Sequence, residues 1–279
     1  MTSPASPAAT EAVNQLHWAT QLLSASCDAL LAREPDDSQS SLAWDDEVDG
    51  FVTRALPAGI RLALLPPSAE IAISHADSLA HASRRIVLHR ITLDDLKAAL
   101  ASEIPAFQSD ATRIAFRDYD MPDHPVALGA PFSFEDPTIL RSLAANWRTA
   151  HLVLESAAAN LDAGDRTPTL LWPHHFDLGN LVLLDAGADP ATDPSVGLGY
   201  VAGDAQIHEP YFYANPYVPN RPENLPALTL GEWTSAWFGA VLTRSNLLKV
   251  APDGLSSTAG RDAVHRFLTH VIDLAQTWR

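Results

Sequence analysis

The feature that most constrains the fold is a motif that occurs twice in the chain. Residues 39–56 and residues 167–184 both carry a leucine, a tryptophan two residues later, and an aspartate five residues after the tryptophan. The matched residues are Leu42, Trp44 and Asp49 in the first copy and Leu170, Trp172 and Asp177 in the second. This pattern indicates one duplicated unit with a pseudo-twofold axis.

The similarity extends on both sides of the motif. A helix-like segment with a tryptophan near its start, Trp18 or Trp147, precedes each copy. Downstream, 60–73 and 196–209 both read as strand, turn and strand, and each half ends in another apolar stretch and a helix. Because the strands are joined by short turns, we expect antiparallel pairing. The sequence therefore predicts an α+β fold of two α-β-β-β-β-α repeats, with helices packed on an antiparallel sheet.

The same pattern predicts the organisation of the chain. Residues 1–10, rich in proline, serine and alanine, are expected to be a disordered tail. The first repeat then covers 11–104 and the second 136–279, and 105–135 links them with one strand at 112–117. We expect the repeats to form one compact domain. Periodic apolar residues place helices at about 11–33, 92–103, 136–162 and 257–277.

The composition argues against several classes of protein. The chain of 279 residues has a formal net charge of −16 and only two lysines, Lys97 and Lys249, so nucleic-acid binding is not expected. No apolar run reaches the roughly twenty residues that span a membrane, and we expect no signal peptide, because the N-terminal residues have neither a basic start nor an apolar segment. The single cysteine, Cys27, excludes an intrachain disulfide and is expected to be buried. We therefore expect a soluble cytoplasmic protein, with its oligomeric state left open.

Strand alternation gives the first prediction for a site. If 170–178 is one strand, Trp172 and His174 share its apolar face, and His175 and Asp177 lie on the other. In the first copy, the same alternation places Glu47 and Asp49 opposite its tryptophan. A pseudo-twofold axis would bring these polar residues into one cleft between the repeats.

A second segment, 207–218, adds polar and aromatic residues. His208 and Glu209 come first, and Tyr211, Tyr213 and Tyr217 then share a strand face suited to lining a pocket. An alternative is an edge strand, maintained by prolines in and around the segment. The predicted cleft is lined by Glu47, Asp49, His175, Asp177, His208, Glu209, Tyr211 and Tyr213.

Three classes of function are consistent with these residues. The first is small-molecule binding in the polar and aromatic cleft. The second is a metal-dependent oxygenase or hydrolase, in which His175, Asp177 and His208 bind a divalent metal as two histidines and one carboxylate. The third is a non-catalytic structural or interaction protein, in which His174 is a hydrogen-bonded core residue and His175 and Asp177 form a surface pair. The sequence leaves open whether the protein is an enzyme.

Two motifs also resemble an uncharacterised bacterial family known as a domain of unknown function. They are W-x-x-x-F-D-L, within L-W-P-H-H-F-D-L at 171–178, and E-P-x-F-Y, within H-E-P-Y-F-Y at 208–213. The likeness runs from Trp18 to about Val241. The resemblance implies no activity, substrate or cofactor for these residues.

Overall fold

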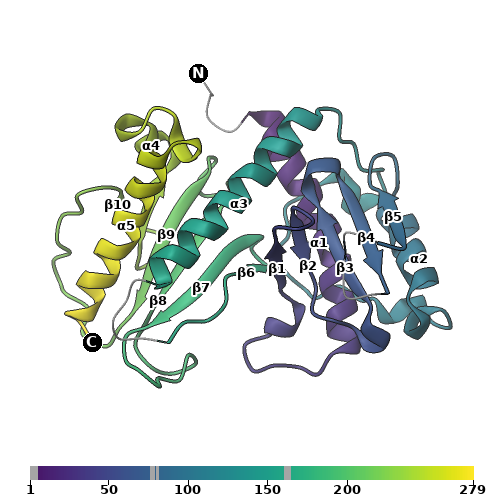
Figure 1. Ribbon diagram of the computed structural model, residues 1–279, viewed down its shortest axis with the longest axis horizontal. Helices are drawn as coiled ribbons and strands as arrows, with labels where there is room; N and C mark the ends of the chain where they lie inside the picture. Colours follow the sequence, from purple (N-terminus) through teal and green to yellow (C-terminus); the bar gives the residue numbers. More distant parts are fainter. Residues whose placement is uncertain (1–5, 76–78, 80–81, 160–164) are drawn as a thin grey trace. The chain divides into compact units, whose positions relative to one another are not determined.

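The computed structural model describes residues 6–75, 79, 82–159 and 165–279 (Figure 1). These residues form five α-helices and eleven β-strands, and the described strand pairs are antiparallel, which confirms the α+β class. Internal contacts divide the chain into two compact units. The N-terminal unit contains Ser6–Ala145 and Leu171–Phe176, and the C-terminal unit contains Asn146–Leu170 and Asp177–Arg279.

The N-terminal unit contains a sheet with its strands in sequence order. The strands are β1 (Leu42–Asp45), β2 (Gly50–Val52), β3 (Arg61–Leu65), β4 (Glu70–Ser74) and β5 (Arg84–Val87). Leu171 and Trp172, the part of β6 (Leu170–Trp172) that belongs to this unit, lie beside β1. Helix α1 (Pro7–Leu30) contacts β3, and α2 (Leu93–Glu103) follows β5 (Figure 1).

Helix α1 begins earlier than the sequence pattern indicates. Pro7 occupies its first turn, and the Ser6 hydroxyl accepts a hydrogen bond from the Ala9 amide at 3.2 Å. The predicted disordered tail is therefore wrong for residues 7–10, while residues 1–5 lie outside the described residues. The side chains of Leu16, Leu23 and Cys27 are buried on this helix, as their spacing predicts.

The segment 105–135 belongs entirely to the N-terminal unit. The strand expected at 112–117 is not formed. Instead, Ala111–Arg113 is a single 3-10 turn, capped by Asp110, whose carboxylate accepts a hydrogen bond from the Thr112 amide. The residues after it are irregular up to the next 3-10 turn, Pro125–Leu128.

The C-terminal unit contains five further antiparallel strands. Its strand order is β10-β11-β9-β8-β7, and Figure 1 shows α5 running along β8 and β9, which it contacts. Helix α3 continues into this unit from the N-terminal unit at Asn146, and residues 160–162 of its predicted extent lie outside the described residues. The elements are α3 (Pro137–Ala159), β7 (Asp177–Leu183), β8 (Ser195–Val201), β9 (Tyr211–Tyr217), β10 (Glu232–Trp233), β11 (Ala240–Thr243), α4 (Arg244–Val250) and α5 (Thr258–Gln276).

The motif segments are hairpins rather than single strands, so the prediction of four strands in each half is wrong. The first hairpin turns over residues 46–49, and the second over residues 173–176. Each turn ends on a residue in the left-handed region, Asp49 with φ 53° and Phe176 with φ 55°. The turn starts one residue closer to the tryptophan in the second copy than in the first.

This shift of one residue changes the burial of the two tryptophans. Trp44 is the second-last residue of β1, whereas Trp172 is the last residue of β6. Successive strand residues point to opposite faces of a sheet. When the two hairpins are compared from the turn backwards, the side chains of Trp44 and Trp172 therefore point to opposite faces. Trp44 is 7 % exposed, while Trp172 is only half-buried. The prediction that both tryptophans are largely buried is confirmed for Trp44, while Trp172 is more exposed than Trp44.

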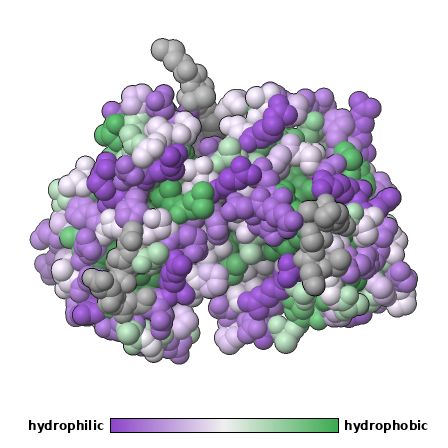
Figure 2. All heavy atoms as spheres, viewed as in Figure 1, coloured by the Kyte–Doolittle hydropathy of each residue, from purple (hydrophilic) through white to green (hydrophobic). Residues whose placement is uncertain are grey.

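The surface is rich in hydrophilic residues. Figure 2 shows them across the visible face, with hydrophobic residues in small separate patches. In the part of the chain that the structure describes, no helix has the length and apolar character needed to cross a membrane.

Candidate functional site

Two predicted site residues, Asp177 and Tyr213, form a direct hydrogen bond in the C-terminal unit. The Tyr213 hydroxyl donates to Asp177 Oδ2 at 2.5 Å, and Asp177 is 6 % exposed. Asp177 begins β7 and Tyr213 lies in β9, so their side chains meet across β8. We call this pair the Asp177–Tyr213 brace. A hydrogen bond to a carboxylate is among the stronger hydrogen bonds in proteins. The brace therefore connects β7 to β9 across β8.

Glycines make room for the ring of Tyr213. Tyr213 pairs with Gly199 on β8, which in turn pairs with Gly179 on β7. A Cβ atom on Gly199 would lie 2.2 Å from Tyr213 Cζ, and one on Gly179 would lie 3.0 Å from the Tyr213 hydroxyl. The ring therefore occupies the space above Gly199 that a ligand would need.

Both tyrosines of the predicted cleft in this unit act as neutral donors. Burial raises the pKa of Tyr213 well above its usual value, and the charge of Asp177 raises it further. Burial also raises the pKa of Tyr211, followed by its hydrogen bond to Asp204, whose carboxylate accepts from the Tyr211 hydroxyl at 2.6 Å. A catalytic acid or base needs a pKa near the working pH, so the raised pKa values make these tyrosines poor candidates for proton transfer. Their neutral hydroxyls are better suited to a structural role as hydrogen-bond donors.

The edge-strand alternative for this segment is wrong. Strand β9 lies between β8 and β11, so it is an interior strand. Pro216 is tolerated because β11 pairs only with Tyr211–Ala214, which leaves the end of β9 without a partner on that side.

His208 and Glu209 lie in the loop before β9, and not on the strand itself. The Glu209 carboxylate accepts hydrogen bonds from the amide and the hydroxyl of Ser245, both at 2.7 Å. It therefore caps the first turn of α4, where a negative charge is favourable. His208 is exposed, and its Nδ1 lies 3.0 Å from the carbonyl oxygen of Asp204.

The three remaining predicted residues belong to the N-terminal unit and lie in the hairpin turns. Glu47 is exposed, and its amide donates to the Asp45 carboxylate at 2.8 Å. Asp49 ends the first turn. His175 is exposed in the second turn, with its ring 4.2 Å from that of His174. The prediction that 170–178 is one strand with two faces is therefore wrong, because the chain reverses at 173–176.

Among the residues that the structure describes, no three His, Cys, Asp or Glu side chains are grouped so that they could hold a metal ion. The predicted ligands fall in both units, since His175 belongs to the N-terminal unit and Asp177 and His208 to the C-terminal unit. The divalent metal remains a prediction from the sequence.

The turn at 173–176 also contributes to a pocket that the sequence does not predict. This pocket has a volume of about 240 Å³. Its lining combines two carboxylates, a hydroxyl, two aromatic rings and an imidazole, and all six residues belong to the N-terminal unit. We call it the His174 pocket, and it is lined by Asp36, Asp37, Ser40, Tyr119, Trp172 and His174.

Helix α1 holds the turn that carries His174. His17 Nε2 and Gln21 Nε2 both donate to the carbonyl oxygen of Pro173 at 2.7 Å. The His17 ring also stacks on Phe176, with centroids 5.0 Å apart. Both polar side chains are buried, and burial lowers the pKa of His17 to about 4, so the ring stays neutral at physiological pH. The turn is therefore fixed at its first and last residues.

An arginine holds the opposite wall of the pocket. Arg117 makes two hydrogen bonds to Asp28, at 2.5 and 2.6 Å, and its Nη1 lies 2.9 Å from Asp37 Oδ2. Arg33 Nε also donates to Asp37, at 3.0 Å. These contacts lower the pKa of Asp37 to about 2, with the hydrogen bond from Arg117 as the largest cause. Asp37 is therefore ionised over the whole physiological range.

His174 lies near both aromatic residues of the pocket. Its ring centroid is 5.7 Å from that of Tyr119 and 6.2 Å from that of Trp172. Burial lowers the pKa of His174 to about 4, and His175 lowers it further, while Asp37 acts in the opposite direction. Burial also raises the pKa of Tyr119. At neutral pH the pocket thus presents a neutral imidazole and a neutral phenol beside the ionised Asp37.

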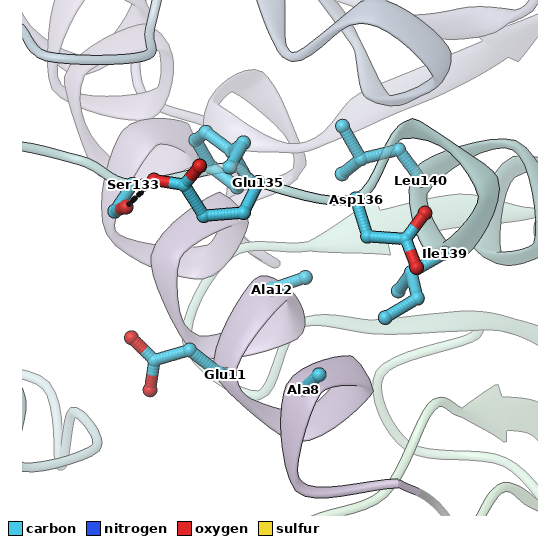
Figure 3. Close-up of a pocket in the computed structure, with 9 residues that line it drawn as sticks. Ala8, Glu11, Ala12, Ser133, Glu135, Asp136, Ile139 and Leu140 are labelled. Atoms are coloured by element: carbon cyan, nitrogen blue, oxygen red, sulfur yellow. Dashed lines mark hydrogen bonds between the residues drawn. The ribbon is translucent and has the colours of Figure 1, made fainter.

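A second pocket, of about 210 Å³, lies between α1 and the start of α3 and is also within the N-terminal unit (Figure 3). Ala8, Ala12, Ile139 and Leu140 make it largely apolar. Its carboxylates are engaged within the protein: Glu135 accepts from the Ser133 hydroxyl at 2.8 Å, as the dashed line in Figure 3 marks. Glu11, Asp136, Ser133 and Phe134 complete the lining. It is therefore a weaker candidate for a functional site.

The chain matches no protein-family model, no curated protein and no solved structure. The resemblance to the uncharacterised bacterial family remains a prediction from the two motifs.

Two features of the sequence point to the segments that form the His174 pocket. Seven acidic residues lie between Glu34 and Asp49, and two of them, Asp36 and Asp37, line it. A second acidic segment, at 118–124, contains Tyr119. The sequence does not reveal that these two segments line the same pocket, because they are about eighty residues apart and lie in irregular structure.

Proposed function

We propose that the protein binds a small organic molecule in the His174 pocket. The observation that carries the proposal is the convergence of Trp172, Tyr119 and His174 with carboxylates on one concave surface. Ligand sites typically combine aromatic walls with a few polar groups and perturbed pKa values. The volume of about 240 Å³ is below the ~300–1,000 Å³ of drug-sized sites, so the expected ligand is small.

Rigidity of the turn supports this choice over the Asp177–Tyr213 brace. His17 and Gln21 fix Pro173, so His174 is held in place before any ligand arrives. In the brace, by contrast, the ring of Tyr213 already covers Gly199. The competing class, a non-catalytic structural or interaction protein, predicts that no small molecule binds in this pocket.

Ligand-observed NMR with a library of small acids, amines and neutral aromatic compounds tests the proposal. We expect hits whose signals are lost with Trp172→Ala and with His174→Ala, because both variants remove a wall of the pocket. Tyr217→Phe is the control, since Tyr217 is an exposed aromatic residue of the C-terminal unit. A library without hits, or hits that both pocket variants retain, would contradict the proposal.

We also propose that the two halves arose by duplication. Both contain a tryptophan hairpin whose four-residue turn ends in the left-handed region, preceded by a long helix. The shift of the turn by one residue and the additional strand and helix before α5 would be later changes. An alignment of related chains tests this: the two hairpins should become more alike in an inferred ancestor, and no such convergence would contradict a duplication.

A further inference from the structure

The charges around the His174 pocket do not cancel. Three carboxylates, those of Asp28, Asp36 and Asp37, lie in or directly behind its wall. Two guanidinium groups, those of Arg33 and Arg117, pair with Asp28 and Asp37. Three negative and two positive charges leave one negative charge, which we assign to Asp36 because it accepts the Ser38 amide, at 3.0 Å, and no arginine contact to it is found among the described residues.

The rest of the lining adds no positive charge. His174 is neutral at physiological pH, and the remaining groups are a hydroxyl, an indole and a phenol. Neither arginine lines the pocket, and the donors of Arg117 are directed to carboxylates. An anionic ligand would therefore meet Asp36 without a cation to bind it.

The aromatic residues favour the opposite charge. The faces of Trp and Tyr rings attract cations, by about 0.5–1 kcal/mol at exposed sites and more where water is excluded. Trp172 and Tyr119 are both half-buried, and both rings lie in the lining of this pocket. A lining that combines a carboxylate with two aromatic rings complements a positively charged nitrogen attached to a compact apolar group.

We infer that the His174 pocket selects a small organic cation, such as a primary amine on a ring or short chain, with Asp36 as the residue that determines specificity for charge. This inference rests on the proposed binding function and specifies the class of ligand.

Three probes with the same ring and different charge test it: benzylamine, benzyl alcohol and benzoate, measured by isothermal titration calorimetry at pH 7 and low salt. We expect benzylamine to bind about tenfold more tightly than benzyl alcohol, which corresponds to one modest ion pair or cation–π contact. Benzoate should bind most weakly. Asp36→Asn should remove the advantage of benzylamine over benzyl alcohol.

The outcomes separate this inference from the proposed function. Equal or tighter binding of benzyl alcohol or benzoate, lost in Trp172→Ala, would overturn the selection of cations while supporting the pocket as a binding site. An Asp36→Asn variant that still prefers benzylamine tenfold would overturn the role of Asp36. If none of the three probes binds and the NMR library gives no hits, both proposals fail.

Discussion

Carboxylates meet aromatic side chains in two regions of this molecule, and the two regions differ in what fills the space between them. In the Asp177–Tyr213 brace, the tyrosine ring lies over Gly199 and its hydroxyl reaches the carboxylate at 2.5 Å. In the His174 pocket, Asp36 and Trp172 line a hollow of about 240 Å³. The same residue types thus give a structural contact in one region and an open pocket in the other.

The difference follows from the local backbone. The brace is built on three paired strands, where residues alternate regularly and glycines allow a ring to lie across the sheet. The pocket is built from a turn and two irregular segments, which do not pack in a repeating pattern. Segments of this kind, when fixed by a rigid scaffold, carry binding residues more often than strand interiors do. The following predictions test this difference through the effects of substitutions and of pH on the stability of the protein.

The largest effect is expected from Gly199→Ala. The new Cβ would lie 2.2 Å from Tyr213 Cζ, so the ring must move away and its hydrogen bond to Asp177 is lost. Overpacking and the loss of a hydrogen bond to a charged group together should lower the free energy of unfolding by about 3–5 kcal/mol. Urea denaturation measures this change.

Gly197→Ala is the control for that experiment. A Cβ on Gly197 makes only ordinary contacts, the nearest at 3.5 Å from the ring of Tyr217. Its effect should stay within about 0.5 kcal/mol. Similar losses in the two variants would show that the sheet is sensitive to any side chain here, and that the brace has no special role.

A smaller effect, of roughly 3 kcal/mol, is expected from the titration of His17. Burial lowers its pKa from the usual 6.5 to about 4, so the folded protein holds the neutral ring while the unfolded chain binds a proton below 6.5. The stabilisation is therefore complete above pH 6.5 and is lost as the pH falls through 4. Measuring the free energy of unfolding at several pH values shows this loss.

His17→Gln tests the assignment. A glutamine amide can still donate to the Pro173 carbonyl but does not titrate. The variant should lose less stability on acidification than the wild type. His174 titrates in the same direction and remains present in both proteins, so it does not contribute to the difference. Identical pH profiles would rule out His17 as a source of acid sensitivity.

Much of the fold could be predicted from the sequence, because helices and strands leave periodic patterns. The spacing of Leu16, Leu23 and Cys27 correctly predicts the buried face of α1. The turn at 173–176 was missed because its residues continue the alternation of the strand before it. Pro173 was the available signal, since proline in a strand favours an end or an edge.

The site was less predictable. Asp177 and Tyr213 were both predicted to line one cleft, and they form a hydrogen bond because strand pairing brings them together across β8. The pocket joins Asp37, Tyr119 and His174, and their proximity depends on Arg117 and His17 holding separate segments. No periodicity encodes such contacts. His174 was considered from the sequence only as a hydrogen-bonded core residue on the apolar face.

The brace should also respond to the loss of a single oxygen atom. Tyr213→Phe keeps the ring over Gly199 but leaves the buried Asp177 carboxylate without this donor. We expect the free energy of unfolding to fall by about 1.5–3 kcal/mol, the usual range for a hydrogen bond to a charged group. Tyr217→Phe, which removes a more exposed hydroxyl that accepts from Asn215, should cost no more than about 0.5 kcal/mol. Equal effects would mean that the brace adds no stability beyond packing.

The smallest effect on stability is expected in the pocket, with Asp36→Asn. Asp36 is exposed, and an asparagine oxygen can still accept the Ser38 amide that Asp36 Oδ1 accepts at 3.0 Å. The free energy of unfolding should therefore change by less than about 0.5 kcal/mol. Asp37→Asn, one position later, breaks the contacts with Arg33 and Arg117 and should cost more. A binding residue is expected to contribute to ligand affinity and little to the stability of the fold. A large loss of stability in Asp36→Asn would therefore make Asp36 a structural carboxylate like Asp177. The contrast between the two regions would then disappear.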